Sequence, residues 1–231
     1  AWSPDGSRIT LAYENGTVVI YDSSDGKAIL TFFGQKEGEI TSAPWSPDGT
    51  RIVSSSSAGE ALIWDAATGE VLLDLLPEDF ELEVPDSAWT KDGERVILLS
   101  EDGFIHIFDA HTGEKISNFF TRAASSYANI SLSPAGDRII IGGYDNVATV
   151  WDIATGVEII TYDVGGLVIP AYSPDGTQVL IGNSMGKLGT LQMFPVWDSL
   201  EELVAYAKEC CVTRELTADE REVFGLPSLE E

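Results

Sequence analysis

Few residues of this chain could carry out covalent or metal chemistry. Its 231 residues include two histidines, His106 and His111, and two adjacent cysteines, Cys210 and Cys211. Zinc sites need clustered His, Cys, Asp or Glu ligands, and a nucleophilic thiol needs a base beside it. No Gly-x-x-x-x-Gly-Lys phosphate loop occurs. Gly182 to Gly186 has the letters Gly-x-Ser-x-Gly, but it lies in a repeat of predicted strands and not before a helix, so we do not expect it to form a nucleophile turn. We therefore expect no catalytic residue, no metal site, no cofactor and no enzymatic activity, with paired carboxylates as the one catalytic arrangement that the sequence leaves open.

Acidic side chains dominate the ionisable residues. Asp and Glu number 38 against 13 Lys and Arg, a formal net charge of −25 at pH 7. Phosphate backbones and anionic lipid surfaces attract clustered basic side chains, so we expect neither nucleic acid nor a membrane as partner. A basic protein or peptide suits this charge better. The chain shows no secretion signal and no apolar run of about 18 residues, and its cysteine usage is typical of reduced thiols, so we expect a cytoplasmic protein.

The most distinctive acidic segment is residues 77–86, Pro-Glu-Asp-Phe-Glu-Leu-Glu-Val-Pro-Asp. It contains five acids and no base. Two interpretations are open: a solvated acidic loop, or an acidic and aromatic docking patch for a basic peptide. Loops held by a rigid scaffold are where binding residues concentrate. The candidate docking residues are Glu78, Asp79, Phe80, Glu81, Leu82 and Glu83.

Two recurring phrases predict the elements that hold this loop. The first, Trp-Ser-Pro-Asp-Gly at residues 2–6, recurs with variations from Trp45, Trp89, Leu132 and Tyr172, at spacings of 43, 44, 43 and 40 residues. Pro and Gly at these positions favour a type I turn. The second phrase is an aromatic–Asp pair, whose Asp follows the Gly of the first phrase by 16 residues. The pairs are Tyr21-Asp22, Trp64-Asp65, Phe108-Asp109 and Trp151-Asp152.

Between these phrases the sequence predicts four short strands in each repeat. Residues 51–56 and 60–65 flank a tight turn, 71–75 form a third strand, and 40–45 form a strand that leads into the turn. Four strands in roughly 43 residues make one propeller blade. About four and a half such repeats fit in the chain.

Residues 1 to about 194 resemble the bacterial type of WD-repeat β-propeller. The resemblance implies an all-β fold and a non-enzymatic protein–protein interaction, scaffold or sensor module, with an enzyme that uses the central channel as the alternative. It also implies that loop 77–86 lies on the partner-binding rim of that channel. Structural roles follow for the repeat positions Asp22, Trp64, Asp65, Asp109, Trp151, Asp152, Asp102 and Asp145.

The chain departs from the hydrogen-bond network of that family. No repeat has a Gly-His pair, and Asp stands in the central tight turn only at Asp102 and Asp145. We therefore expect apolar packing between blades to supply most of the rigidity. On the same grounds we expect His106 to be a strand residue packed between blades, and not a base or a metal ligand.

Residues 198–231 predict a helical extension, separate from the blades at 1–197. Asp198 and Glu201 suit a helix N-terminus, and Leu200, Leu203, Val204, Ala207 and Cys211 fall on one helix face. A second short helix is predicted from Thr217 to near Gly225. The extension is similar to the C-terminal segment of large bacterial signalling and conflict proteins. It could cap the blades or dock a partner.

The repeat count leaves the closure of the propeller open. The first repeat lacks its innermost strand and the fifth lacks its outermost one. Three arrangements fit: the C-terminal part of a longer propeller, two or more copies that close a ring together, or an atypical five-bladed ring. The first two add blades from the same parent chain or from another copy as partners.

Overall fold

A computed structural model of the chain describes residues 1–33, 38–77, 80–121, 123, 125, 127–185, 188–196 and 205. The chain divides into two compact units, Ala1–Phe194 and Pro195–Glu231. The predicted helical extension, apart from Ala205, and both cysteines lie outside the described residues. Within the described part of the chain, no helix is long and apolar enough to cross a membrane.

The described strands form five antiparallel sheets. The first contains β1 (Arg8–Ala12), β2 (Val18–Asp22) and β3 (Ala28–Phe32); the second β4 (Ile40–Ser42), β5 (Arg51–Ser56), β6 (Ala61–Asp65) and β7 (Val71–Asp74); the third β8 (Asp86–Trp89), β9 (Arg95–Leu99), β10 (Phe104–Asp109) and β11 (Lys115–Phe120); the fourth β12 (Asn129–Leu132), β13 (Arg138–Gly142), β14 (Val147–Asp152) and β15 (Val157–Asp163); the fifth β16 (Leu167–Tyr172), β17 (Gln178–Met185) and β18 (Leu188–Pro195).

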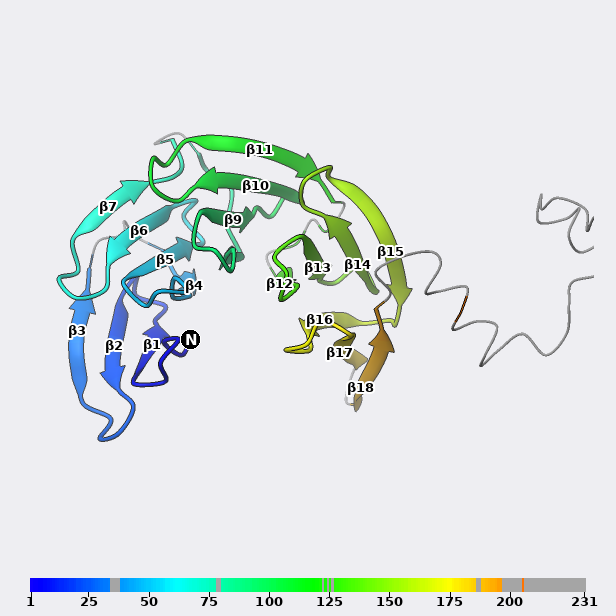
Figure 1. The fold of residues 1–231 in the computed structure, drawn as a ribbon, viewed down its shortest axis with the longest axis horizontal. Helices are drawn as coiled ribbons and strands as arrows, with labels where there is room; N and C mark the ends of the chain where they lie inside the picture. Colours follow the sequence, from blue (N-terminus) through cyan, green and yellow to red (C-terminus); the bar gives the residue numbers. More distant parts are fainter. Residues whose placement is uncertain are drawn as a thin grey trace, which may run out of the picture. The chain divides into compact units, whose positions relative to one another are not determined.

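Each sheet is a meander in which neighbours in sequence are neighbours in space. Trp2 forms an isolated bridge with Ile9, and Trp45 forms the same bridge with Ile52, so β1 repeats the place of β5. The all-β fold and the antiparallel sheet repeat expected from the sequence are confirmed. Figure 1 shows the sheets of the first unit one after another along an arc, with β4 and β12 on its inner side and β3, β7, β11 and β15 on its outer side.

The Ser-Pro-Asp-Gly turns are built from local hydrogen bonds. The Ser46 hydroxyl donates to Asp48 Oδ1 (2.6 Å), and the same oxygen accepts the N–H of Thr50 (3.0 Å). The Gly49 N–H donates to the Ser46 carbonyl (2.9 Å), with Gly49 at a φ of 70°, a conformation that glycine adopts without strain. These bonds stabilise the carboxylate and lower the pKa of Asp48. The same contacts lower the pKa of Asp175 to about 2.

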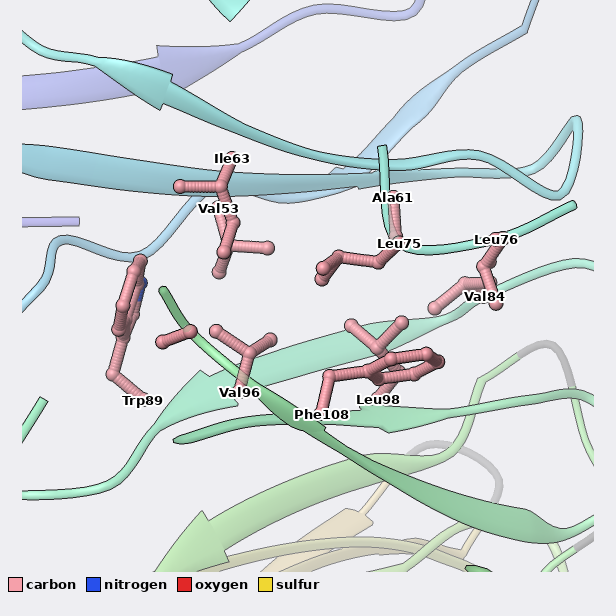
Figure 2. Close-up of a cluster of buried hydrophobic side chains, with 11 residues drawn as sticks. Val53, Ala61, Ile63, Leu75, Leu76, Val84, Trp89, Val96, Leu98 and Phe108 are labelled. Atoms are coloured by element: carbon pink, nitrogen blue, oxygen red, sulfur yellow. The ribbon is translucent and has the colours of Figure 1, made fainter. Parts of the chain in front are cut away.

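Apolar side chains fill the space between consecutive sheets. Figure 2 shows Val53 and Ile63 of the second sheet facing Val96, Leu98 and Phe108 of the third. Similar clusters join the first sheet to the second and the third to the fourth. Burial of this surface contributes roughly 25 cal/mol per Å².

Trp64 shows how little of this junction depends on hydrogen bonding. Its side chain is fully buried and stacks on Phe32 of the first sheet, with ring centroids 4.2 Å apart and an interplanar angle of 7°. Its indole N–H has no hydrogen-bond partner among the described residues. The Trp64 position is therefore held by stacking and apolar contact, as the departures from the family network led us to expect.

Candidate functional site

The innermost strands of four sheets meet around a polar hollow. Short cross-sheet bonds fix these strands to one another: the Thr41 hydroxyl of β4 donates to the carbonyl of Val84 (2.5 Å), and Tyr172 N–H of β16 donates to Ser131 Oγ of β12 (3.1 Å). The hollow has a volume of about 560 Å³. Its polar lining consists of Glu39, Thr41, Ser57, Glu83, Tyr127 and Asn129. We call it the axial cavity.

Two carboxylates give the axial cavity its charge. Glu39 and Glu83 stand at the same position of successive repeats, six residues before Trp45 and Trp89. Their main chains are fixed, because Glu39 N–H donates to Ser57 Oγ (2.9 Å) and Glu83 N–H donates to Glu101 Oε1 (3.3 Å). Neither carboxylate has an ion-pair partner among the described residues, and no Lys or Arg lines the cavity there. The cavity therefore carries a negative potential.

A third carboxylate, Asp86, joins innermost strands of neighbouring sheets. Its Oδ2 accepts the N–H of Ile130 from β12 (3.0 Å). Burial raises the pKa of Asp86, while hydrogen bonds from Ile130, Ser42 and Ser87 act in the opposite direction. Since Ser42 lies on β4 and Ile130 on β12, Asp86 links three neighbouring sheets. It is a structural residue that joins the innermost strands.

Tyrosine rings add an aromatic surface to one side. Tyr127 lines the axial cavity and is exposed, and its ring meets Tyr144 edge-to-face at 5.2 Å and 81°. The edge-to-face contact leaves ring surface accessible to a ligand. An exposed tyrosine face beside free carboxylates suits a cationic side chain with an apolar stem.

The docking residues predicted in loop 77–86 lie in different environments in the structure. Glu83 faces the axial cavity, whereas Phe80 and Glu81 line a second hollow of about 230 Å³ together with Glu60 and Asp74. Leu82 is half-buried. Glu78 and Asp79 lie outside the described residues.

Phe80 anchors the loop instead of projecting from it. Its side chain packs on the apolar cluster between the second and third sheets, and its ring meets His106 edge-on at 6.0 Å. A Cβ at Gly59 would lie 2.6 Å from the Phe80 carbonyl oxygen, so the loop main chain rests directly on the turn before β6. Among the described acids of this segment, Glu81 is the exposed one.

His106 lies in β10 and is buried. The Ser100 hydroxyl donates to Asp102 Oδ1 (2.5 Å), so the His106 Nε2–H donates to Ser100 Oγ (3.1 Å). Burial, with a smaller contribution from Lys115, lowers the pKa of His106 to about 4, and the imidazole is neutral at pH 7. Its Nδ1 has no hydrogen-bond partner in the described part of the chain. A buried, neutral ring between Phe80 and Phe104 agrees with a packing role.

The repeat aspartates accept hydrogen bonds from main-chain N–H groups of the turns. Asp65 Oδ1 accepts the N–H groups of Ala67 (2.9 Å) and Thr68 (2.8 Å), which lowers its pKa. Asp22, Asp109 and Asp152 accept main-chain N–H groups in the same way. Trp151 donates from Nε1 to Thr149 Oγ1 (2.8 Å), and Asp145 lies in the turn between β13 and β14. Across the described residues, no three His, Cys, Asp or Glu side chains gather closely enough to hold a metal ion.

The sequence reasoning missed Glu39, Ser57, Tyr127 and Asn129. One signal was available, because Glu39 and Glu83 coincide when the second and third copies of the phrase, at Trp45 and Trp89, are aligned. The other residues come from different loops of different repeats, and only the folded arrangement places them around one cavity.

Successive antiparallel sheets, packed face to face around their innermost strands, define a β-propeller type of repeat protein. Residues 14–192 match the family model described as outer membrane protein assembly factor BamB, and the chain belongs to this family of β-propeller-type repeats. A search of the curated proteins finds no match.

Proposed function

We propose that the chain is a non-enzymatic protein–protein interaction module that docks a basic peptide or protein segment in the axial cavity. The observation that carries this proposal is the pair Glu39 and Glu83, which share one repeat position and line one cavity of about 560 Å³. The family description names an assembly factor, which supports a role in binding other proteins.

The lining explains why a basic segment fits. An Arg or Lys side chain can place its charge between the carboxylates of Glu39 and Glu83 and its methylene stem against Tyr127. The amide of Asn129 and the hydroxyl of Ser57 can bond to the main chain of an extended peptide. The opposite charge also speeds association and selects against acidic partners.

The repeat phrases support a more specific proposal for the type of blade and for the role of the module. We infer a WD-repeat type of blade, in a scaffold or sensor part of a larger bacterial signalling protein that acts in the cytoplasm. The Trp-Ser-Pro-Asp-Gly and aromatic–Asp phrases support this type, although the Gly-His pair of that family is missing.

Peptide binding to the whole chain tests the proposal. A fluorescent peptide of about eight residues that alternates arginine and leucine should bind, and its glutamate–leucine counterpart should not. Glu39→Gln and Glu83→Gln should each weaken binding by about fivefold to tenfold, which corresponds to ~1 kcal/mol for one desolvated charge contact.

Matched controls separate a local contact from net charge. Glu70→Gln and Glu114→Gln remove the same charge from exposed turns after β6 and β10. They should leave the affinity within about twofold, because exposed charges beyond about 8 Å are screened at physiological salt. Equal weakening by all four variants, or equal binding of both peptides, would overturn the proposal.

A further inference from the structure

The outer strands of the first four sheets each contain a β-bulge at the same repeat position. In β3 the pairing with β2 shifts between Ile20 and Tyr21, which leaves Ile29 as an extra, unpaired residue. The same shift leaves one extra residue in β7, β11 and β15. An extra residue of this kind bends the strand and interrupts its ladder of hydrogen bonds. The four bulge residues are Ile29, Leu72, Ile116 and Ile159.

The bulge residues are aliphatic and half-exposed, with 45% to 54% of each surface accessible. Each stands three residues after the glycine of its aromatic–Asp phrase, as Leu72 does after Gly69. The residue after the bulge packs inward, because Leu30 lies 3.4 Å from a Cβ built on Gly69 of the next repeat. The bulge therefore interrupts the edge of the outer strand while the strand stays packed on its neighbour.

The bulges lie on the edges that the described strands leave unpaired. β3, β7, β11 and β15 each end their sheet on the outer side of the arc, and no described strand pairs with them there (Figure 1). The inner edges differ, because β4, β8, β12 and β16 each contact the next around the axial cavity. Directly after β7 the Leu75 N–H donates to the Ala61 carbonyl (2.9 Å), so the N–H of Asp74 faces outward. An open edge with such groups can pair with another strand.

We propose that the four bulges protect the outer edges against strand addition, so that copies of this chain do not join edge to edge. A second strand extends a sheet where the edge ladder is regular, and each bulge breaks that regularity within a strand of four to seven residues. Exposed charges add protection at two edges, because Lys115 precedes Ile116 and Glu158 precedes Ile159. β3 contains no charged residue, so the bulge carries the protection there.

Deletion of Leu72 tests the proposal, because it removes the extra residue and leaves β6 and β7 in an unbroken register. The measurement is sedimentation velocity of the whole chain from roughly 1 to 100 μM. The deletion variant should reach a higher average mass than the wild type, with association at least about tenfold tighter. Deletion of Ile29 from β3 repeats the test at a second edge.

Two variants separate the strand edge from the exposed aliphatic side chain. Leu72→Ser keeps the bulge and loses that side chain, so it should keep the wild-type mass. Asp74→Pro, added to the deletion of Leu72, removes an outward N–H and should restore the wild-type mass, although it also removes a repelling charge. Equal association of Leu72→Ser and the deletion variant would overturn the proposal, because an apolar patch would then explain both.

Circular dichroism and urea titration establish whether each deletion variant is folded. Association of either folded deletion variant, reversed by proline in the case of β7, supports the proposal. Folded variants that both keep the wild-type mass would overturn it. Loss of the fold in both would also overturn it, because the bulge would then be required for the packing of the sheet and not for its edge. Peptide binding in the axial cavity does not depend on these results.

Discussion

The guanidinium of Arg51, at the start of β5, lies over the ring of Trp89 at the end of β8, and Arg51→Met tests what this contact contributes to stability. The variant keeps an apolar stem against Trp89 but loses the charge over the ring at 4.9 Å and the hydrogen bonds to Ala110 (2.6 Å) and Gly93 (3.3 Å). A partly desolvated cation–π contact contributes about 1 kcal/mol, and a hydrogen bond from a charged donor about 1.5 kcal/mol. Because one such contact and two such hydrogen bonds are lost, we expect the free energy of unfolding to fall by about 4 kcal/mol, measured by urea titration with tryptophan fluorescence.

Arg95→Met is the matched control for this prediction. Arg95 begins β9 at the repeat position of Arg51, but Leu132 replaces the tryptophan of the next phrase. Arg95 is exposed, so its loss should cost less than about 0.5 kcal/mol. Equal losses in the two variants would refute the view that the stacked ring and its neighbouring carbonyls stabilise the junction.

Two further changes test the loop and the turns. Gly59→Ala should destabilise the chain by about 1–3 kcal/mol more than Gly26→Ala. Both residues have positive φ, but only a Cβ at Gly59 would collide with the Phe80 carbonyl oxygen (2.6 Å). Thermal unfolding of the two variants measures the difference, and equal midpoints would contradict the prediction. The pKa of Asp48 is lowered in the folded chain, so its contribution to the free energy of unfolding is complete above the unfolded pKa of 3.8 and is lost as pH falls through the lower folded pKa. The pKa of Asp86 is raised in the folded chain, so its contribution to the free energy of unfolding becomes more favourable as pH falls. Urea titrations at pH 7 and pH 2.5 should therefore show a smaller acid loss in Asp48→Asn and a larger one in Asp86→Asn than in the wild type, and the reverse order would contradict the assigned directions.

Local turn chemistry made much of the fold predictable. The strand expected at 51–56 is β5, and the strand expected at 60–65 is β6 from Ala61, because Pro, Gly and Asp specify the turns at their ends within a few residues. The register of each hairpin follows from those turns. The helical extension at 198–231 stays a prediction.

The site was less predictable, because its residues are joined by contacts between repeats. The acidic residues around Phe80 in the sequence predict an exposed aromatic side chain. In the structure this side chain packs against an apolar cluster and the ring of His106. Glu83 was selected for its charge, whereas its significance depends on Glu39, 44 residues earlier in sequence and on the same cavity. The position of Arg51 repeats visibly, but its partner Trp89 belongs to the next blade.

The most direct test of the account is to locate a bound basic peptide on the chain. The arginine–leucine peptide, carrying a photoreactive group, would be crosslinked to the whole protein and the attachment sites identified by mass spectrometry. We predict attachment at the axial cavity, around Thr41, Pro85 and Tyr127, and its loss when Glu39 and Glu83 are both changed to Gln. Attachment mainly along the outer strands β7 and β11, unchanged in that double variant, would contradict the account.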